Sequence, residues 1–206
     1  MNEKITTAHD DLAFMRELAE RGQRGSITGG SLFVAGGLLY GLQCLYHWLQ
    51  LRGVIDPPGP VNLLFAIGPT VVFLVVLVAV LWKDRKAGES GLMGRALNAV
   101  FGGVGLANLA MVAVFGFNAA QAGDLKIWLF YPAVIFALQG AAWYAAAVLR
   151  KRAWMGVVAF GWLATATALG LVRDNAEAYL LITVAALLLL MALPGFVLIR
   201  LSRQAA

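Results

Sequence analysis

Apolar residues dominate six long stretches of the chain, and short segments rich in charged residues, proline and glycine separate these stretches. The hydrocarbon core of a bilayer is about 30 Å thick, so a helix needs roughly 20 residues to cross it. Each stretch is long enough. The pattern therefore predicts an all-α, polytopic membrane protein, a six-transmembrane-helix bundle. The spans are expected at about 26–48, 61–82, 96–117, 127–149, 154–172 and 178–199.

The first 25 residues follow a different pattern, in which apolar positions recur at helical spacing among charged ones. Leu12, Met15 and Leu18 share one face of such a helix, and opposite charges lie four residues apart beside them. The pattern predicts a short amphipathic helix that lies on the cytoplasmic leaflet, caps the bundle or docks a cytoplasmic partner. The chain then divides into an N-terminal segment, 1–25, and a transmembrane bundle, 26–206.

The amino-acid composition agrees with a membrane location. Hydrophobic residues make up 61% of the chain and charged residues only 13%, whereas a soluble domain has about 25% charged residues. A net charge of +5 would suggest nucleic-acid binding in a soluble protein. Here the basic residues flank the spans, where they set orientation instead. We therefore expect membrane lipids, and no nucleic acid, around this chain.

Basic residues are distributed unequally between the two sides of the predicted bundle. Of the 16 Lys and Arg residues, 13 lie in the N-terminal segment, in the loop 83–95, at 150–152 and at 200–203. Arg52, Lys126 and Arg173 lie on the other side. The positive-inside rule then places both termini in the cytoplasm. The expected location is a bacterial inner membrane, crossed several times.

Glycine spacing in the first predicted span indicates close helix packing. Gly37 and Gly41 form a GxxxG motif, and Gly30 lies seven residues before Gly37. Small residues at this spacing let two membrane helices approach closely. Gly103 continues a similar small-residue pattern in the third span, which we expect to pack against the first. The glycines serve either packing within the bundle or a face for a homodimer or a membrane-protein partner.

Four polar side chains are expected near the middle of the membrane: Gln43, Thr70, Asn108 and Gln139. An amide in hydrocarbon needs a hydrogen-bond partner, so these groups should face inward. Pro69 precedes Thr70 and frees a backbone carbonyl that a neighbour or a ligand must satisfy. The side chains either bond neighbouring helices or line a pocket for an uncharged or weakly polar ligand.

Several chemistries find no support in the sequence. No Asp, Glu, Lys or Arg lies in the middle of a predicted span, which argues against proton-driven transport and voltage sensing. His9 and His47 are expected on opposite sides of the membrane, which excludes a pair of haem-ligating histidines. Nucleophile-elbow, HExxH, Walker and dinucleotide-binding motifs are absent from the sequence. We therefore expect no catalytic residue, no metal site and no cofactor.

The chain resembles small, uncharacterised six-span inner-membrane proteins of bacteria. The resemblance is carried by the segment Asp10–Arg16, by the glycine-rich first span that closes in His47-Trp48, and by Pro194-Gly195 before Arg200. It covers the whole chain by pattern, includes no diagnostic motif and implies fold and location only. In size and span count the chain is also similar to the substrate-binding components of vitamin transporters.

These patterns favour a non-enzymatic membrane protein that acts as a scaffold, a sensor or an accessory subunit through helix–helix packing. Gly30, Gly37, Gly41 and Gly103 are the residues expected to make that contact. The alternative is a solute- or lipid-binding transport component with an uncharged pocket at the midplane.

Overall fold

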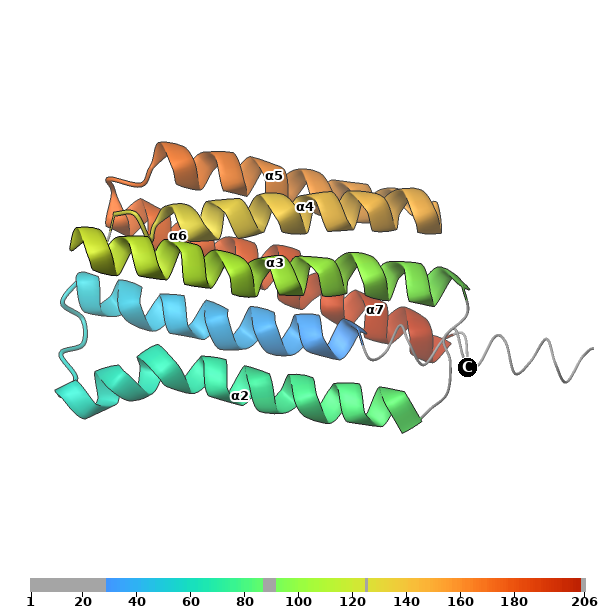
Figure 1. The fold of residues 1–206 in the computed structure, drawn as a ribbon, viewed down its shortest axis with the longest axis horizontal. Coiled ribbons are helices and arrows are strands. Elements are labelled where there is room, and N and C mark those ends of the chain that lie inside the picture. Colours follow the sequence, from blue (N-terminus) through green and yellow to red (C-terminus); the bar gives the residue numbers. More distant parts are fainter. Residues whose placement is uncertain (1–28, 87–91, 125, 205–206) are drawn as a thin grey trace, which may run out of the picture.

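The computed structural model describes residues 29–86, 92–124 and 126–204, which form helices and short turns with no strand. Six of the helices are long and apolar enough to cross a membrane, which is consistent with the predicted multi-pass membrane protein. They lie side by side in one elongated bundle (Figure 1). The predicted N-terminal amphipathic helix lies outside the described residues.

Each predicted span corresponds to one helix or to one continuous helical segment. The first helix covers Gly29–Leu51. It is followed by α2 (Gly59–Lys86), α3 (Leu92–Ala122), α4 (Phe130–Arg150) and α5 (Ala153–Leu171). The last span, Ala176–Gln204, consists of α6 (Ala176–Ala186), the π-helical segment η1 (Leu187–Ala192) and α7 (Leu193–Gln204).

Two differences from the predicted boundaries have simple causes. The helices α2 and α3 extend well beyond the apolar stretches, because a helix can continue into polar residues at the membrane surface. The helix α4 begins three residues later than predicted, because Asp124 organises a turn before it. The Asp124 carboxylate accepts a hydrogen bond from the Lys126 backbone N–H, at 2.8 Å, and the Asp124 carbonyl accepts one from the N–H of Ile127.

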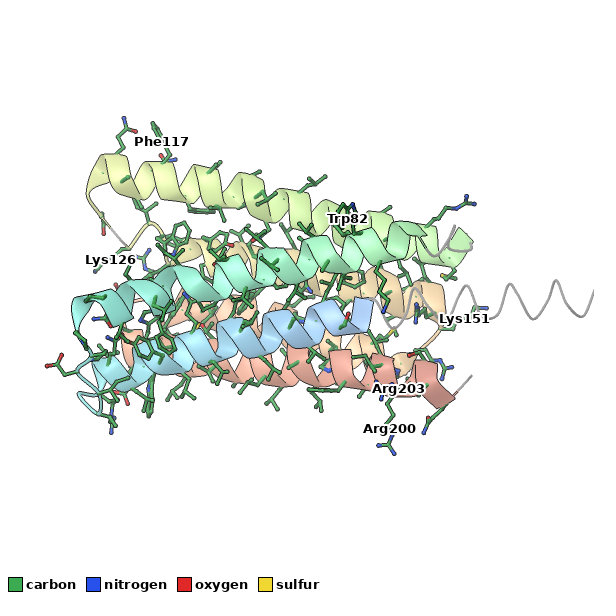
Figure 2. The ribbon with its side chains drawn as sticks, turned by 90° about the horizontal axis from the view of Figure 1, so that it is seen from below. Trp82, Phe117, Lys126, Lys151, Arg200 and Arg203 are labelled. Carbon is green, nitrogen blue, oxygen red and sulfur yellow. The ribbon has the colours of Figure 1, made fainter. Side chains whose placement is uncertain are left out.

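Successive spans run in opposite directions, so the start of the first helix and the end of α7 lie at the same end of the bundle (Figure 1). Lys151, Arg200 and Arg203 project at this end, which we call the basic end, and Lys126 lies at the opposite end (Figure 2). The side-by-side arrangement thus separates the two groups of basic residues as the sequence pattern predicts.

The densest packing lies between α4, α5 and the last span. Trp143 and Trp162 are each 1% exposed, and Leu169 is fully buried. A Cβ added at Gly140 of α4 would lie 3.1 Å from the Ala159 carbonyl oxygen of α5. The absence of a side chain at Gly140 therefore lets α4 and α5 approach closely, as small residues do in other membrane bundles.

The helices α2 and α3 lie at the periphery of the bundle. No residue in the most apolar 18-residue segment of α2 or of α3 is buried. In the last span, 44% of the corresponding segment is buried. Large apolar side chains such as Leu64, Val75 and Leu106 are exposed. Such exposure is costly in water but not in lipid, because hydrocarbon chains are as apolar as the side chains themselves.

Candidate functional site

The three predicted glycines of the first helix form a seam against the last span, which we call the glycine seam. A Cβ added at Gly37 would lie 2.5 Å from the backbone nitrogen of Ala192 and 2.7 Å from the Leu187 carbonyl oxygen. A Cβ at Gly30 would lie 2.9 Å from the Gly195 carbonyl oxygen. The two backbones are therefore in direct contact, with no room for a side chain at either glycine.

Gly41 completes the glycine seam more loosely, since a Cβ there would meet Leu188 side-chain atoms at 3.1 Å. The last span contributes its own glycine. A Cβ at Gly195 would lie 2.8 Å from the Gly30 carbonyl oxygen and 2.8 Å from the Val34 nitrogen. Local spacing does not indicate that Gly195 is the counterpart of Gly30, although Gly195 follows a proline that marks this position in the sequence.

The fourth predicted packing glycine, Gly103, lies elsewhere. A Cβ at Gly103 would meet nothing within 4 Å. The first helix does contact α3, but through Phe33 and Phe101, whose ring centroids are 5.1 Å apart. The expected packing of the first and third spans through small residues therefore does not occur at Gly103, because the last span occupies the glycine face of the first helix.

The π-helical segment η1 has a hydrogen-bond partner on α5. Pro194 has no N–H to donate to the Leu190 carbonyl four residues earlier, and the Trp162 indole Nε1 donates to that oxygen at 3.1 Å. An unsatisfied carbonyl would be costly in this half-buried position. Trp162 therefore stabilises the irregular stretch of the last span, which also forms one wall of the glycine seam.

Like Trp162, Gln43 donates a hydrogen bond to a backbone carbonyl near a proline, here the proline of α2. Its amide Nε2 donates to the Ala66 carbonyl at 3.0 Å. Pro69 cannot supply an N–H to the Phe65 carbonyl, so the hydrogen-bond ladder of α2 is interrupted at the turn that Gln43 reaches. The Tyr46 and Phe65 rings stack on each other beside this contact, with centroids 3.9 Å apart.

Two more of the predicted polar residues lie beside tyrosines from neighbouring helices. The Tyr131 hydroxyl of α4 donates to the Asn108 Oδ1 of α3 at 2.6 Å. The Tyr40 hydroxyl of the first helix lies close to the Thr70 side chain of α2. Thr70 is exposed and the other three residues are half-buried. Pairs of side chains thus join α3 to α4 and the first helix to α2.

Gln139 differs from the other three predicted polar residues. It is half-buried on α4, and no hydrogen bond joins it to any residue that the structure describes. Trp143 lies one helical turn further along. Its buried indole nitrogen has no hydrogen-bond partner in the described part of the chain.

A polar network at the end opposite the basic end was not predicted. The amide oxygen of Asn62 accepts hydrogen bonds from the Tyr46 hydroxyl, at 2.8 Å, and from Gln50 Nε2. Asn62 in turn donates to the Pro57 carbonyl at 3.2 Å, and His47 Nδ1 lies 3.0 Å from the Gln50 Oε1. The network ties the first helix to α2. Asn62 follows the proline-rich turn 56–60, and this position was the only sequence signal for it.

Each of the three described basic residues at the same end forms an ion pair. Arg52 pairs with Glu177, and Asp174 accepts from Lys126 at 3.1 Å and lies 3.7 Å from Arg173. The hydrogen bond from Lys126 is the main cause that holds the pKa of Asp174 below its usual range. These pairs link the three loops at this end of the bundle.

Among the described residues, no cluster of three His, Cys, Asp or Glu side chains could hold a metal ion.

The site residues predicted from sequence fall into two structural groups. Gly30, Gly37 and Gly41 lie in one buried seam, while Gln43, Thr70, Asn108 and Gln139 are spread over four helices.

Comparison with family models, with curated proteins and with solved structures finds no match to this chain.

Proposed function

We propose that this chain is an inner-membrane protein of a bacterium, with both termini in the cytoplasm, and that it acts as a non-enzymatic scaffold or accessory subunit. The separation of charge along the bundle supports the orientation, because Lys151, Arg200 and Arg203 lie at the end where the described part of the chain begins and ends (Figure 2). Basic residues favour the cytoplasmic side of a membrane.

The open glycines of α3 carry the proposal of a binding role. Gly102, Gly103 and Gly105 are exposed, and a Cβ at any of them would meet nothing within 4 Å. Glycine in a helix interior costs about 1 kcal/mol relative to alanine, and close packing offsets that cost in the glycine seam. On α3 no neighbour within the described chain offsets it. A second helix packed on this face would do so.

The proposed occupant of the α3 face is a transmembrane helix of another subunit, in the simplest case α3 of a second copy. The glycine seam is not available for this role, because the last span of the same chain fills it. The face on α3 is flanked by the exposed side chains of Leu106 and Leu109. Small residues beside large apolar ones are typical of helix pairs in membranes.

The test is the oligomeric state of Gly103→Leu in mild detergent and in lipid nanodiscs, with Gly170→Leu as the matched control. Gly170 of α5 is equally exposed, and a Cβ there also meets nothing within 4 Å. We expect both variants to fold and only Gly103→Leu to lose self-association or co-purification of a partner. Equal association of the wild type and both variants would contradict the proposal.

Gln139 favours a second candidate function, that of a solute- or lipid-binding transport component. Its amide lies half-buried in the middle of α4 with no hydrogen bond to a described residue, and such a group in hydrocarbon is stabilised by a partner. A native mass spectrum of gently purified protein distinguishes the two functions. A bound small molecule that Gln139→Leu removes would favour transport, whereas a second protein chain that Gly103→Leu removes favours the accessory subunit.

A further inference from the structure

The two ends of the bundle differ in how their charges are balanced. Where the structure describes acidic side chains, these lie at the end opposite the basic end: Asp56, Asp124, Asp174 and Glu177. There, each basic residue has an acidic partner. At the basic end, Lys151, Arg152, Arg200 and Arg203 form no ion pair with a described residue. The basic end thus presents positive charge that the described part of the chain does not neutralise.

The connection between α4 and α5 concentrates this charge. Only Lys151 and Arg152 separate the two helices, and Arg150 precedes them, so three consecutive residues are basic. Lys151 has a φ of 51°, and its N–H caps α4 at the Ala147 carbonyl. Glycine is the residue that this left-handed position favours. The chain therefore retains a lysine here at a cost in conformational energy.

The surroundings of this turn suit an anion with an apolar body. Arg152 is the residue before α5, and no side chain caps that helix, so the positive end of its dipole faces the turn. Below the turn, Val148 of α4 and Val157 of α5 are more than half exposed. Both hydrophobic side chains lie within two turns of the helix ends, where the acyl chains of a lipid begin.

We propose that the α4–α5 turn, residues 150–152, binds the phosphate group of an anionic phospholipid whose acyl chains lie along α4 and α5. The recognition combines two cations that have no ion-pair partner in the described part of the chain, an uncapped helix start and apolar side chains below them. Basic sites between membrane helices bind anionic headgroups in this way. The inference requires only that the helices cross a bilayer, and it does not depend on the proposed partner at α3.

The test is native mass spectrometry of the full-length protein titrated with phosphatidylglycerol or with phosphatidylcholine of the same acyl chains. The test variant is Lys151→Gly with Arg152→Gln, in which glycine preserves the left-handed turn. The matched control is Lys126→Gln, which removes one cation from the opposite end. We expect the wild type and the control to prefer phosphatidylglycerol, and the double variant to bind it about tenfold more weakly or worse.

A variant with Arg152→Gln alone keeps the test informative if the double variant is unstable, and we expect it to lose part of the preference. Inorganic phosphate added to the titration distinguishes a lipid from a free anion. We expect millimolar phosphate to leave the bound lipid in place. Displacement by phosphate would overturn the assignment to a lipid. An equal preference for phosphatidylglycerol in the wild type and the double variant would overturn the site itself.

Discussion

Gly37 of the first helix and Gly103 of α3 lie in similar small-residue patterns but in opposite surroundings. A Cβ at Gly37 would collide with the backbone of the last span at 2.5 Å, while one at Gly103 would meet nothing within 4 Å. The first helix and the last span are in direct backbone contact. The helix α3 presents its glycines to the outside of the chain.

A small-residue pattern indicates that a helix can pack closely, and it does not identify the neighbouring helix. Both helices could have met through their glycines, since both are apolar and of sufficient length. The last span displaces α3 from the glycine seam because Gly195 matches Gly30. The glycines of α3 remain open for a contact outside the chain, which is the basis of the proposed accessory role.

The largest expected effect is that of Gly37→Leu. A leucine there must displace the backbone of the last span, and overpacking of this kind costs about 3 kcal/mol or more. We expect loss of folded protein or a strongly lowered unfolding temperature in detergent, measured by circular dichroism. Gly103→Leu should fold like the wild type. If both variants unfolded alike, the contrast between the two glycines would be wrong.

Trp162→Phe should have the next largest effect. It removes the donor to the Leu190 carbonyl and leaves that oxygen unsatisfied, at a cost of about 1–3 kcal/mol. Pro194→Ala restores an N–H to the position four residues after Leu190. Chemical denaturation of the two single variants and the double variant should show that Trp162→Phe costs less in the Pro194→Ala background. An additive result would mean that the indole stabilises η1 by packing alone.

Asn108→Leu should weaken the contact between α3 and α4 by a smaller amount. Interhelical hydrogen bonds in membrane proteins contribute about 0.6 kcal/mol on average and up to about 1.7 kcal/mol, and Asn108 accepts from Tyr131 at 2.6 Å. The matched change Tyr131→Phe should have an equal effect, and the double variant should lose little more than either one. Thermal unfolding in detergent measures all three.

The smallest effect is expected at the Asp174 carboxylate. Because its pKa is lowered in the folded protein, its ion pairs stabilise the fold above the ordinary carboxyl pKa of about 4 and are lost as pH falls below it. The unfolding temperature of the wild type should therefore fall slightly more between about pH 6 and about pH 3 than that of Asp174→Asn. An identical pH dependence in both proteins would show that these exposed pairs contribute nothing measurable.

Much of the fold follows from composition and hydrophobic length. Six apolar stretches predicted six spans within a few residues, because the bilayer sets a minimum length for any helix that crosses it. Alternation of basic loops predicted which residues share an end, as Lys151 and Arg203 do (Figure 2). The glycine pattern predicted close packing but did not identify the helix that packs against it.

The hydrogen-bond partners of the polar residues could not be predicted. Gln43 bonds a backbone carbonyl of α2 and Asn108 bonds Tyr131, and neither pairing has a signal in local spacing. Such contacts depend on the rotation and height of one helix relative to another, which the apolar pattern of a membrane helix leaves undetermined. Trp162 and η1 were missed for the same reason, since only Pro194 marked the position in the sequence.

Segment length, hydropathy and charge were sufficient to predict six apolar helices with most of the basic residues at one end, because each of these properties acts on one segment at a time. Which helices touch depends on the tertiary structure. Gly37 packs against the last span, whereas Gly103 faces no described neighbour, and Arg52 has an ion-pair partner, whereas Lys151 has none among the described residues. Lipid solvates every apolar helix face equally well, so helix neighbours are determined by shape complementarity and by hydrogen bonds between segments that are distant in the chain.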